Sequence, residues 1–463
     1  MHPSLAQSIP KTKLLYIQTF GCQMNEYDSA RVERMLTLQG YRLTAEIQHA
    51  DVIFINTCAV REKAEQKVYS FLGRLRRLKA HHPGLKVLIA GCIAQQLGKK
   101  LLTRFDHLDL VLGTRSLAAL PNLLEKIQAS GVRLAHLRDE ENSSDPSRDD
   151  CLTTVRGVTA PLTIMQGCDN YCSYCIVPYV RGTESSRPSR EILKEIQALV
   201  AAGVGEVTLL GQNVNSYGKK TVHELSFSEL LQKIQAETAI KRLRFTTSHP
   251  KDLTEEVMLC FANLECLCHN LHLPVQAGSD RILKLMNRGY IAAEYLEKIE
   301  RLRQLCPDIG LSTDFMVGFP GETEQDFQDT LRLLEQVQFD TLFSFGYSDR
   351  PHTKAIRFPD KVPDRDKHRR LVELQALQAE ITLCRNHNEI GRMREILVEG
   401  PSKAGGDQWM GRTQQNRIVN FESSVDLTGQ LVRVRIVAAY SHSLRGELMN
   451  GYVGPSPSSP NTR

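Results

Sequence analysis

Short apolar runs alternate with longer amphipathic stretches over the first third of the chain. The apolar runs predict β-strands, and the stretches between them have the periodicity of helices. Strands are predicted over Lys13–Thr19, Asp51–Thr57, Lys86–Gly91 and Leu108–Gly113, and helices over Asp28–Gly40 and residues 62–81. This alternation is typical of a parallel sheet covered by helices, which places the N-terminal part in the α/β class.

The same rhythm resumes at Leu152 and continues to about Arg385. Six apolar runs predict strands, and helical stretches such as Ser189–Gly203 separate them. Six strands joined by crossover helices predict a partial (β/α)6 barrel. The predicted strands are Leu162–Gln166, Glu206–Gln212, Arg242–Ser248, Asn270–Val275, Gly310–Phe319 and Thr341–Ser348.

The pattern changes after a long amphipathic helix predicted over residues 365–387. Short alternating strands with glycine turns follow, which predicts a small β-barrel. Earlier, the polar and acidic stretch Arg138–Asp150 is typical of a solvated linker. The predicted parts are an N-terminal domain (12–137), a linker (138–152), a central domain (153–385) and a C-terminal barrel (386–453).

Composition indicates a folded protein, with 41% hydrophobic and 24% charged residues. No apolar run reaches the roughly 20 residues that cross a bilayer, and Met1–Lys13 does not read as a secretory signal. We therefore expect a cytoplasmic protein with no membrane contact. Its 12 cysteines would then lie in a reducing compartment, where metal or cluster ligation is commoner than disulfide formation. The net charge of +5 permits a nucleic-acid partner without requiring one.

Cys168, Cys172 and Cys175 form a CxxxCxxC run just after the first predicted strand of the central domain. Three thiolates on one short loop can ligate three irons of a [4Fe–4S] cluster and leave one iron open. S-adenosylmethionine can chelate an open iron through its amino and carboxylate groups. Tyr174 would pack over the adenine side of such a site. The alternatives are chance spacing or a zinc loop, but zinc prefers two CxxC-like pairs, and no such pair follows.

Cys22, Cys58 and Cys92 are far apart in the sequence, but each comes directly after a predicted parallel strand. Parallel strands end on the same side of a sheet, so the three thiols should converge at one rim. Three convergent cysteines again suggest a [4Fe–4S] cluster with one open iron. Three buried structural cysteines are the alternative.

These motifs, together with their flanking residues, resemble one enzyme family. The CxxxCxxC run after the first strand of a six-stranded barrel resembles the radical S-adenosylmethionine superfamily. The segments "GCQMNEYDS" (Gly21–Ser29), "NTCAVREKAEQK" (Asn56–Lys67) and "AGCIAQ" (Ala90–Gln95) resemble the N-terminal domain of its methylthiotransferases. The C-terminal barrel resembles their TRAM module, so the likeness covers about residues 13 to 452.

The resemblance implies an enzyme with two [4Fe–4S] clusters and S-adenosylmethionine as cofactors. The barrel cluster would generate a radical from S-adenosylmethionine, and the N-terminal cluster would hold the sulfur to be transferred. "GCQMNEYDS" together with "LLGQNVNSYG" (Leu209–Gly218) most resembles the branch that methylthiolates C2 of N6-isopentenyladenosine at position 37 of tRNA. Its partners would be the anticodon loop of tRNA and an electron-donor protein, and the chain would act as a monomer.

Two other functions compete with this interpretation. Relatives within the family act on threonylcarbamoyl-adenosine of tRNA or on an aspartate of a ribosomal protein, and they carry the same terminal barrel. A protein of another class would be a non-catalytic RNA-binding sensor that holds iron–sulfur clusters. Open iron sites argue against the sensor, because structural clusters normally have four protein ligands.

Residues at later strand ends resemble family motifs that line the cofactor site. By this resemblance Gln212 and Asn213 are candidates for contact with the methionine amino group, and Gln276 for contact with the ribose. Gly318 begins a turn that would let the backbone approach the adenine. A turn or core role is the alternative for each of these residues.

Clusters of basic residues predict contacts with RNA phosphates. Arg181 and Arg187 follow the cluster loop and could bind RNA or the cofactor carboxylate. Arg74, Arg76 and Arg77 belong to a basic stretch, Lys67–Lys86, that contains no acidic residue. Arg412 lies on a predicted strand of the barrel, a fold that commonly binds single-stranded RNA. A solvated surface is the alternative for each cluster.

Overall fold

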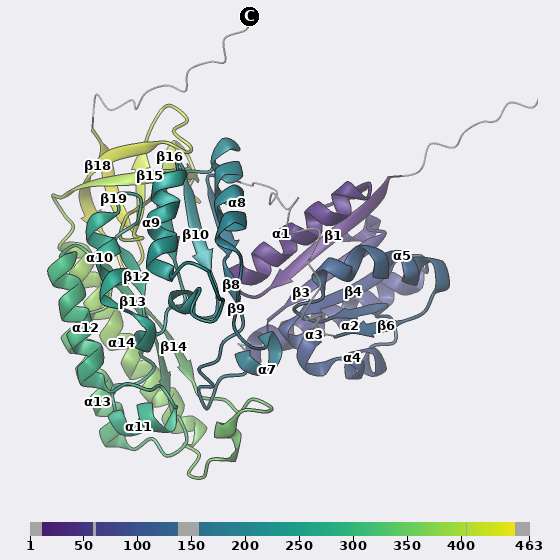
Figure 1. Ribbon diagram of the computed structural model, residues 1–463, viewed down its shortest axis with the longest axis horizontal. Helices are drawn as coiled ribbons and strands as arrows, with labels where there is room; N and C mark the ends of the chain where they lie inside the picture. Colours follow the sequence, from purple (N-terminus) through teal and green to yellow (C-terminus); the bar gives the residue numbers. More distant parts are fainter. Residues whose placement is uncertain (1–11, 59–61, 138–156, 404, 450–463) are drawn as a thin grey trace, which may run out of the picture. The chain divides into compact units, whose positions relative to one another are not determined.

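The computed structural model describes residues 12–58, 62–137, 157–403 and 405–449 (Figure 1). The chain forms two compact units. Unit 1 holds residues 12–137 together with Tyr179–Arg181, and unit 2 holds the other described residues. The predicted linker (138–152) lies outside the described residues. Within the described part, no helix is both long enough and apolar enough to span a bilayer.

Unit 1 contains a six-stranded parallel sheet with strand order β2-β1-β3-β4-β5-β6. β1 pairs with β2 on one side and with β3 on the other, so the direction of strand addition reverses between β1 and β3. Ligands of such sheets bind beyond the carboxyl ends of the strands at this reversal. The strands are β1 (Lys13–Phe20), β2 (Tyr41–Leu43), β3 (Val52–Thr57), β4 (Lys86–Gly91), β5 (Leu110–Leu112) and β6 (Leu134–His136).

Helices cover both faces of this sheet (Figure 1). One face packs against α1 and α5 through an apolar cluster that includes Leu36, Phe54 and Leu124. α2 contacts β1 and β3, and its Phe71 meets Phe20 edge to face. The helices are α1 (Gln23–Leu38), α2 (Glu62–His81), α3 (Cys92–Leu97), α4 (Lys99–Arg104) and α5 (Leu120–Ser130).

The predicted parallel α/β domain is confirmed, but the predicted start of its first helix is wrong. Asp28 was predicted to start α1, but the helix begins at Gln23 with Cys22 as its N-cap. The Cys22 and Asn25 side chains each accept from the other residue's backbone N–H in a capping box. Asp28 is instead a buried residue inside the helix.

Unit 2 begins with six parallel strands that follow one another in space in chain order. β7, β10 and β11 form one group and β12, β13 and β14 another, and a parallel bridge between Leu243 and Leu267 joins the two groups. This arc confirms the predicted partial (β/α)6 barrel. The strands are β7 (Thr159–Thr163), β10 (Glu206–Leu210), β11 (Arg242–Phe245), β12 (Asn270–His272), β13 (Gly310–Val317) and β14 (Thr341–Gly346).

Crossover helices flank the arc and share one apolar core with it (Figure 1). Fully buried aromatic rings such as Phe315 and Phe339 fill that core. Two short strands, β8 (Met165–Gln166) and β9 (Ser185–Ser186), pair across the cysteine loop. The helices are α8 (Ser189–Ala201), α9 (Phe227–Glu237), α10 (Glu255–Asn263), α11 (Asp280–Leu285), α12 (Ala292–Leu305), α13 (Glu324–Val337) and α14 (Asp364–His387). A short helix, α7 (Val177–Arg181), follows the cysteine loop, and its last three residues belong to unit 1.

The C-terminal part is the predicted small β-barrel. Its strands close in the order β15-β16-β17-β19-β18 around a separate apolar core that includes Val398, Phe421 and Val434. Closure leaves no unpaired sheet edge. The strands are β15 (Met393–Pro401), β16 (Gln408–Thr413), β17 (Ile418–Glu422), β18 (Leu431–Ala439) and β19 (Leu444–Leu448).

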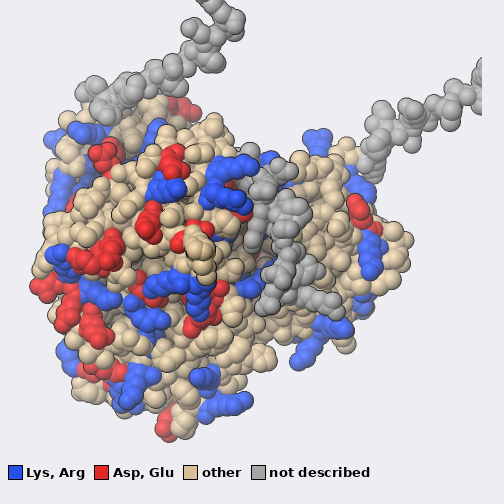
Figure 2. All heavy atoms as spheres, in the orientation of Figure 1, with Lys and Arg blue, Asp and Glu red and all other residues tan. Residues whose placement is uncertain are grey.

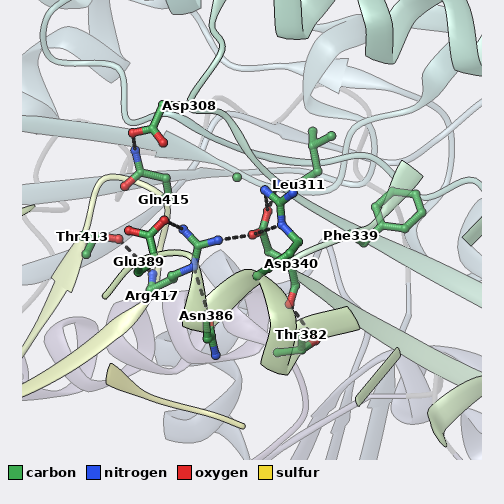
Figure 3. A network of polar contacts seen from close by, with 12 residues as sticks. Asp308, Leu311, Phe339, Asp340, Thr382, Asn386, Glu389, Thr413, Gln415 and Arg417 are labelled. Carbon is green, nitrogen blue, oxygen red and sulfur yellow. Dashed lines mark hydrogen bonds and ion pairs between the residues drawn. The ribbon is translucent and has the colours of Figure 1, made fainter. Parts of the chain in front are cut away.

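A buried polar network joins this barrel to the rest of unit 2 (Figure 3). Arg417 of the barrel forms ion pairs with Asp340, at the start of β14, and with Glu389, just after α14. Asp340 also accepts hydrogen bonds from Leu311 N and from Arg385 Nε, both at 2.7 Å. Because each charge has an opposite partner, the network satisfies its buried groups as it fixes the barrel.

Candidate functional site

Three strand ends in unit 1 carry the predicted cysteines. Cys22 caps α1 directly after β1, Cys58 follows β3, and Cys92 begins α3 after β4. Cys22 is exposed, whereas Cys58 and Cys92 are buried. The first two therefore flank the reversal between β1 and β3, and the third stands one strand further along the same rim.

The three thiols converge as predicted. The Cys22 and Cys58 thiols share a hydrogen bond, and the Arg181 side chain bonds to Cys92 and interacts electrostatically with Cys22. Hydrogen bonding with the Cys58 thiol, together with the Arg181 charge, lowers the pKa of Cys22 to about 6. Cys22 is therefore largely a thiolate near neutral pH, the form that ligates metal.

Asparagine side chains and glycines determine the conformation of these strand ends. Asn25 Nδ2 donates to Asn56 Oδ1 at 2.8 Å, and Asn56 Nδ2 donates back to the Asn25 carbonyl at 2.9 Å. A Cβ on Gly21 would lie 2.9 Å from the Cβ of Cys58, and one on Gly91 would lie 2.2 Å from the Thr57 carbonyl oxygen. Glycine is therefore needed at both positions for the strand ends to come this close.

Arg181 was predicted to bind RNA or the cofactor carboxylate, and the structure gives it another environment. Its guanidinium is buried and pairs with Asp28 at 3.3 Å. The guanidinium also interacts electrostatically with Cys92 and Cys22. This arginine therefore acts within the cysteine rim of unit 1 and is not offered to RNA phosphates.

The second cysteine set lies on the loop that follows β8. Cys175 N donates to the Cys172 carbonyl at 2.9 Å, and Cys168 N donates to the Gly182 carbonyl at 3.2 Å. Burial raises the pKa of Cys168 to about 11 and that of Cys175 to about 12. These thiols would stay protonated near neutral pH without a metal, so ligation must couple proton release to iron binding.

Residues distant in the sequence fix this loop. Gly167 N donates to the Gln212 side chain at the end of β10. Ser173 Oγ donates to the Leu285 carbonyl at 2.8 Å, and Asn287 Nδ2 donates to the carbonyls of Asn170 and Tyr171, both at 3.1 Å. Gln212, a predicted cofactor contact, thus holds the residue immediately before Cys168.

Arg288 contacts this cysteine set, and sequence reasoning missed it. Its Nη1 donates to Cys172 Sγ at 3.4 Å. Tyr174, predicted to pack over the adenine side, is part of the same cluster, since it interacts electrostatically with Arg288, Cys172 and Cys175. A lone arginine in "LMNRGY" carries no local signal that it will be buried beside a thiol.

Orphaned polar atoms test whether S-adenosylmethionine fits at this rim. Thr163 Oγ1, Asn213 Oδ1, Ser248 Oγ and His249 Nε2 are buried without a hydrogen-bond partner. Buried polar atoms in folded proteins are nearly always bonded, so several orphans together indicate a missing polar ligand. All four follow or end β7, β10 or β11, at the carboxyl ends of adjacent strands. They suit the amino, carboxylate and hydroxyl groups of S-adenosylmethionine.

The other two predicted cofactor contacts are constrained backbone positions. Gln276 is buried and has a φ of 78°, a left-handed conformation that is uncommon outside glycine. Gly318 has a φ of 71° and donates its N–H to Glu322. A Cβ at Gly318 would lie 2.3 Å from Lys367 Cγ, so here the glycine admits a lysine stem beside the turn.

The donor sets also test the fit of iron–sulfur clusters. Among the described residues, no three His, Cys, Asp or Glu side chains are arranged to hold a single metal ion. A [4Fe–4S] cluster instead spreads its thiolates over separate irons. Each of the two all-cysteine sets offers three thiols, the ligands that such a cluster takes.

Three family models match the chain. They are "Uncharacterized protein family UPF0004" over residues 14–113, "Radical SAM superfamily" over residues 162–334 and "TRAM domain" over residues 388–449. A tRNA-2-methylthio-N(6)-dimethylallyladenosine synthase of Syntrophobacter fumaroxidans is 61% identical over 96% of this chain and 98% of its own length. Synthases of the same name from Geobacter metallireducens and Moorella thermoacetica are 52% and 46% identical, over 94% and 95% of this chain and 98% and 99% of their own lengths.

The chain belongs to the tRNA-2-methylthio-N(6)-dimethylallyladenosine synthase family. It is therefore an enzyme of the radical S-adenosylmethionine superfamily, and its cofactors are S-adenosylmethionine and [4Fe–4S] clusters.

Solved structures share the fold of this chain. The radical S-adenosylmethionine methyltransferase TsrM from Kitasatospora setae, with tryptophan and a cofactor analogue bound, aligns with a TM-score of 0.54 at 13% identity, over 74% of this chain and 75% of its own. The cobalamin-dependent radical enzyme OxsB aligns with a TM-score of 0.52 at 10% identity, over 80% of this chain and 56% of its own. At these identities the likeness shows the fold alone.

The predicted RNA contacts of this chain differ in solvent exposure. Arg74, Arg76 and Arg77 are exposed on α2, and only Arg76 has a carboxylate partner among the described residues, Asp106 at 2.8 Å. Arg412 is partly exposed and pairs with Glu399 at 2.9 Å. In the view of Figure 2 basic and acidic side chains are interspersed over unit 2. Contacts with RNA would therefore depend on individual side chains on this face.

Arg187 contacts other residues of unit 2. It lies largely buried, donates to the Thr163 carbonyl at 2.8 Å and pairs with Glu195 at 2.8 Å. The Tyr217 hydroxyl donates to the Arg187 carbonyl at 2.7 Å. This arginine supports the end of β7 and does not face an RNA strand.

Proposed function

We propose that this chain adds a methylthio group to C2 of N6-isopentenyladenosine at position 37 of tRNA, next to the anticodon. The observation that carries the proposal is the pair of cysteine sets, one at the strand ends of unit 1 and one on the loop after β8 in unit 2. Each set supplies three thiols, which leaves one iron of each cluster free for a ligand of the reaction. The names of the relatives support the choice of nucleoside.

Cys168, Cys172 and Cys175 would hold the cluster that works with S-adenosylmethionine, and Cys22, Cys58 and Cys92 would hold the auxiliary cluster. When bound, these groups supply a radical able to abstract hydrogen from an unactivated C–H bond, and the sulfur that is transferred. The protein positions both groups.

The residues of unit 2 bind and orient the cofactor. Thr163, Asn213 and Ser248 offer unpaired polar atoms at adjacent strand ends, where they would bond its amino, carboxylate or hydroxyl groups. Gln212 holds Gly167 and so sets the position of Cys168 relative to these atoms. His249 accepts a backbone N–H at Nδ1, which places its own proton on the unpaired Nε2, available as a donor.

RNA binding would use exposed basic residues on both units. Arg74, Arg76 and Arg77 of α2 would contact phosphates, and Arg412 would contact the RNA held by the barrel. The target base must leave its stack to reach the reacting groups. A single-stranded anticodon loop makes this inexpensive in free energy. We further propose that the chain acts as a monomer in the cytoplasm and receives its electrons from a donor protein.

Nucleoside mass spectrometry of bulk tRNA tests the proposal. Removal of this chain from its host should abolish 2-methylthio-N6-isopentenyladenosine and accumulate the prenylated nucleoside that lacks sulfur. Persistence of that product, with loss of a threonylcarbamoyl derivative or a changed ribosomal-protein mass, would assign the chain to another branch of the methylthiotransferases. If no methylthio product changed, a cluster-holding RNA sensor would become the better interpretation.

Complementation with variants ties the activity to the two sites. Cys22→Ala and Cys172→Ala should each abolish the product, and each should lower the iron bound by the purified chain. Cys384→Ala provides the control, because Cys384 is an exposed cysteine on α14 outside both sets. Full activity in either site variant would refute the assignment of that site.

A further inference from the structure

Arg288 is a buried cation to which the proposed chemistry gives no role. Only 5% of its surface is exposed. Its Nε donates to the Tyr290 hydroxyl at 3.0 Å, its Nη2 to the Pro274 carbonyl at 2.6 Å and its Nη1 to Cys172 Sγ at 3.4 Å. The guanidinium is therefore fixed on three sides, with a cluster cysteine as one of its three partners.

No carboxylate in the described part of the chain pairs with the Arg288 guanidinium, and the titratable groups that act on it include Tyr174, Tyr290 and Cys172. A buried guanidinium is strongly unfavourable unless an anion compensates it. The group that this geometry offers as a counter-charge is the sulfur of Cys172, a proposed ligand of the cluster.

We propose that Arg288 raises the reduction potential of the cluster held by Cys168, Cys172 and Cys175. The inference rests on the proposed function, because it requires a cluster at these cysteines. Reduction of the cluster takes up one electron from a reductant and adds one negative charge. A fixed cation and an N–H···S hydrogen bond both favour the more negative state. Arg288 acts through Cys172, so it is a positioning residue.

A redox titration of the full chain measures this effect. The chain carries Cys22→Ala, Cys58→Ala and Cys92→Ala and is loaded anaerobically with iron and sulfide, so that only one cluster contributes to the paramagnetic resonance signal of the reduced state. Titanium(III) citrate serves as the reductant. At the potential where half of the parent cluster is reduced, Arg288→Gln should lower the ratio of reduced to oxidised cluster at least tenfold, which is about 59 mV for a one-electron couple.

Two further variants separate charge from structure. Arg288→Lys keeps the positive charge, so its ratio should stay within tenfold of the parent. Arg281→Gln makes the same change of net charge at a half-exposed site on α11, where Arg281 pairs with Asp326. Its ratio should equal that of the parent, because a solvated charge is screened.

Each outcome of the titration supports or overturns the inference about Arg288. An unchanged ratio in Arg288→Gln with full iron content overturns the inference and leaves the proposed function intact. If Arg288→Gln binds too little iron to titrate, Arg288→Lys decides: a ratio within tenfold of the parent supports the role of the charge, and a larger fall overturns it. Loss of the cluster in both variants assigns Arg288 to loop folding and also overturns the inference. A parent chain that binds no cluster at these cysteines refutes the proposed function itself.

Discussion

At the scale of single residues, Gly91 controls how closely β3 and β4 bring Cys58 and Cys92 together. It has a φ of 93° and a ψ of −164°, a region that is essentially restricted to glycine. Gly91→Ala should add about 1–3 kcal/mol of backbone strain, and its Cβ would also clash with the Thr57 carbonyl oxygen. We expect a lower thermal-unfolding midpoint and less iron bound at Cys22, Cys58 and Cys92.

Gly40→Ala is the matched control for this substitution. Gly40 also has a positive φ, of 87°, but a Cβ there would meet nothing within 4 Å. Differential scanning calorimetry and iron analysis of both variants separate backbone strain from the clash at the rim. Equal iron content in the two variants would show that the approach of β3 and β4 does not shape the cluster site.

A second residue, Asp326, bonds to the N-cap residues of two helices, Thr323 of α13 and Ser279 of α11. It accepts from Thr323 N at the start of α13, at 2.8 Å, and from Ser279 Oγ, the N-cap of α11. Burial opposes its ionisation, but hydrogen bonds from Arg281, Ser279 and Thr323 outweigh burial and lower the pKa of Asp326. Asp326→Asn should therefore lower the thermal-unfolding midpoint, by a loss of about 1–3 kcal/mol.

The pH dependence of this loss of stability follows from the direction in which the pKa of Asp326 is shifted. A carboxyl group whose pKa is lowered in the folded state stabilises the fold at every pH above its unfolded value of about 3.9. The difference between parent and Asp326→Asn should thus be the same at about pH 6 and about pH 8. Asp329→Asn, which removes an exposed ion pair with Arg332 on the same helix, should change the midpoint little. A loss that grows between these two pH values would contradict the assignment.

At the scale of elements, α2 presents basic residues that the fold does not use. Arg74 and Arg77 are exposed, and no carboxylate pairs with either of them in the described part of the chain. The double variant Arg74→Gln with Arg77→Gln should weaken tRNA binding and reduce the salt dependence of the affinity by about one unit of slope per lost phosphate contact. Filter binding over a series of salt concentrations measures both quantities.

Lys99 and Lys100 of α4 provide the control for the α2 variant. Both are exposed in the same unit, so Lys99→Gln with Lys100→Gln makes an equal change of net charge. If α2 contacts RNA, only the α2 variant should change the slope. Equal effects of the two variants would mean that net charge alone governs binding.

The strand-end cysteines were predictable because a parallel sheet has a single carboxyl rim, so a cysteine after each strand must lie on it. Arg181 and Arg187 were misjudged for a physical reason. Their sequence context is exposed and basic in appearance, but tertiary packing buries each beside an acid, Asp28 and Glu195. Arg288 was missed because its partner, Cys172, is more than one hundred residues away in the sequence. The local sequence pattern predicts helices, strands and the side of the sheet on which strand ends lie. The partner of a buried charged side chain depends on how distant parts of the chain fold together.

At the scale of the whole molecule, unit 2 joins a catalytic arc and a terminal barrel as one compact body. The polar network of Figure 3 links them, and Asp340 is its central acid, with Arg385 and Arg417 both paired to it. The Asp340, Arg417 and Glu389 side chains are each no more than 10% exposed. Any RNA held by the barrel would therefore keep a fixed geometry relative to the arc.

Asp340→Asn tests whether this network holds the barrel in place. It leaves Arg385 without its buried acid and Arg417 with Glu389 alone, and removing one partner of a buried pair costs about 3–5 kcal/mol. Hydrogen exchange of β15 to β19 should become faster, because the barrel opens from the arc more often. Arg435→Gln breaks an exposed pair with Glu447 in the same barrel and should leave exchange unchanged. Slow exchange in Asp340→Asn would show that apolar contacts alone fix the barrel, and the network would then only satisfy its own buried charges.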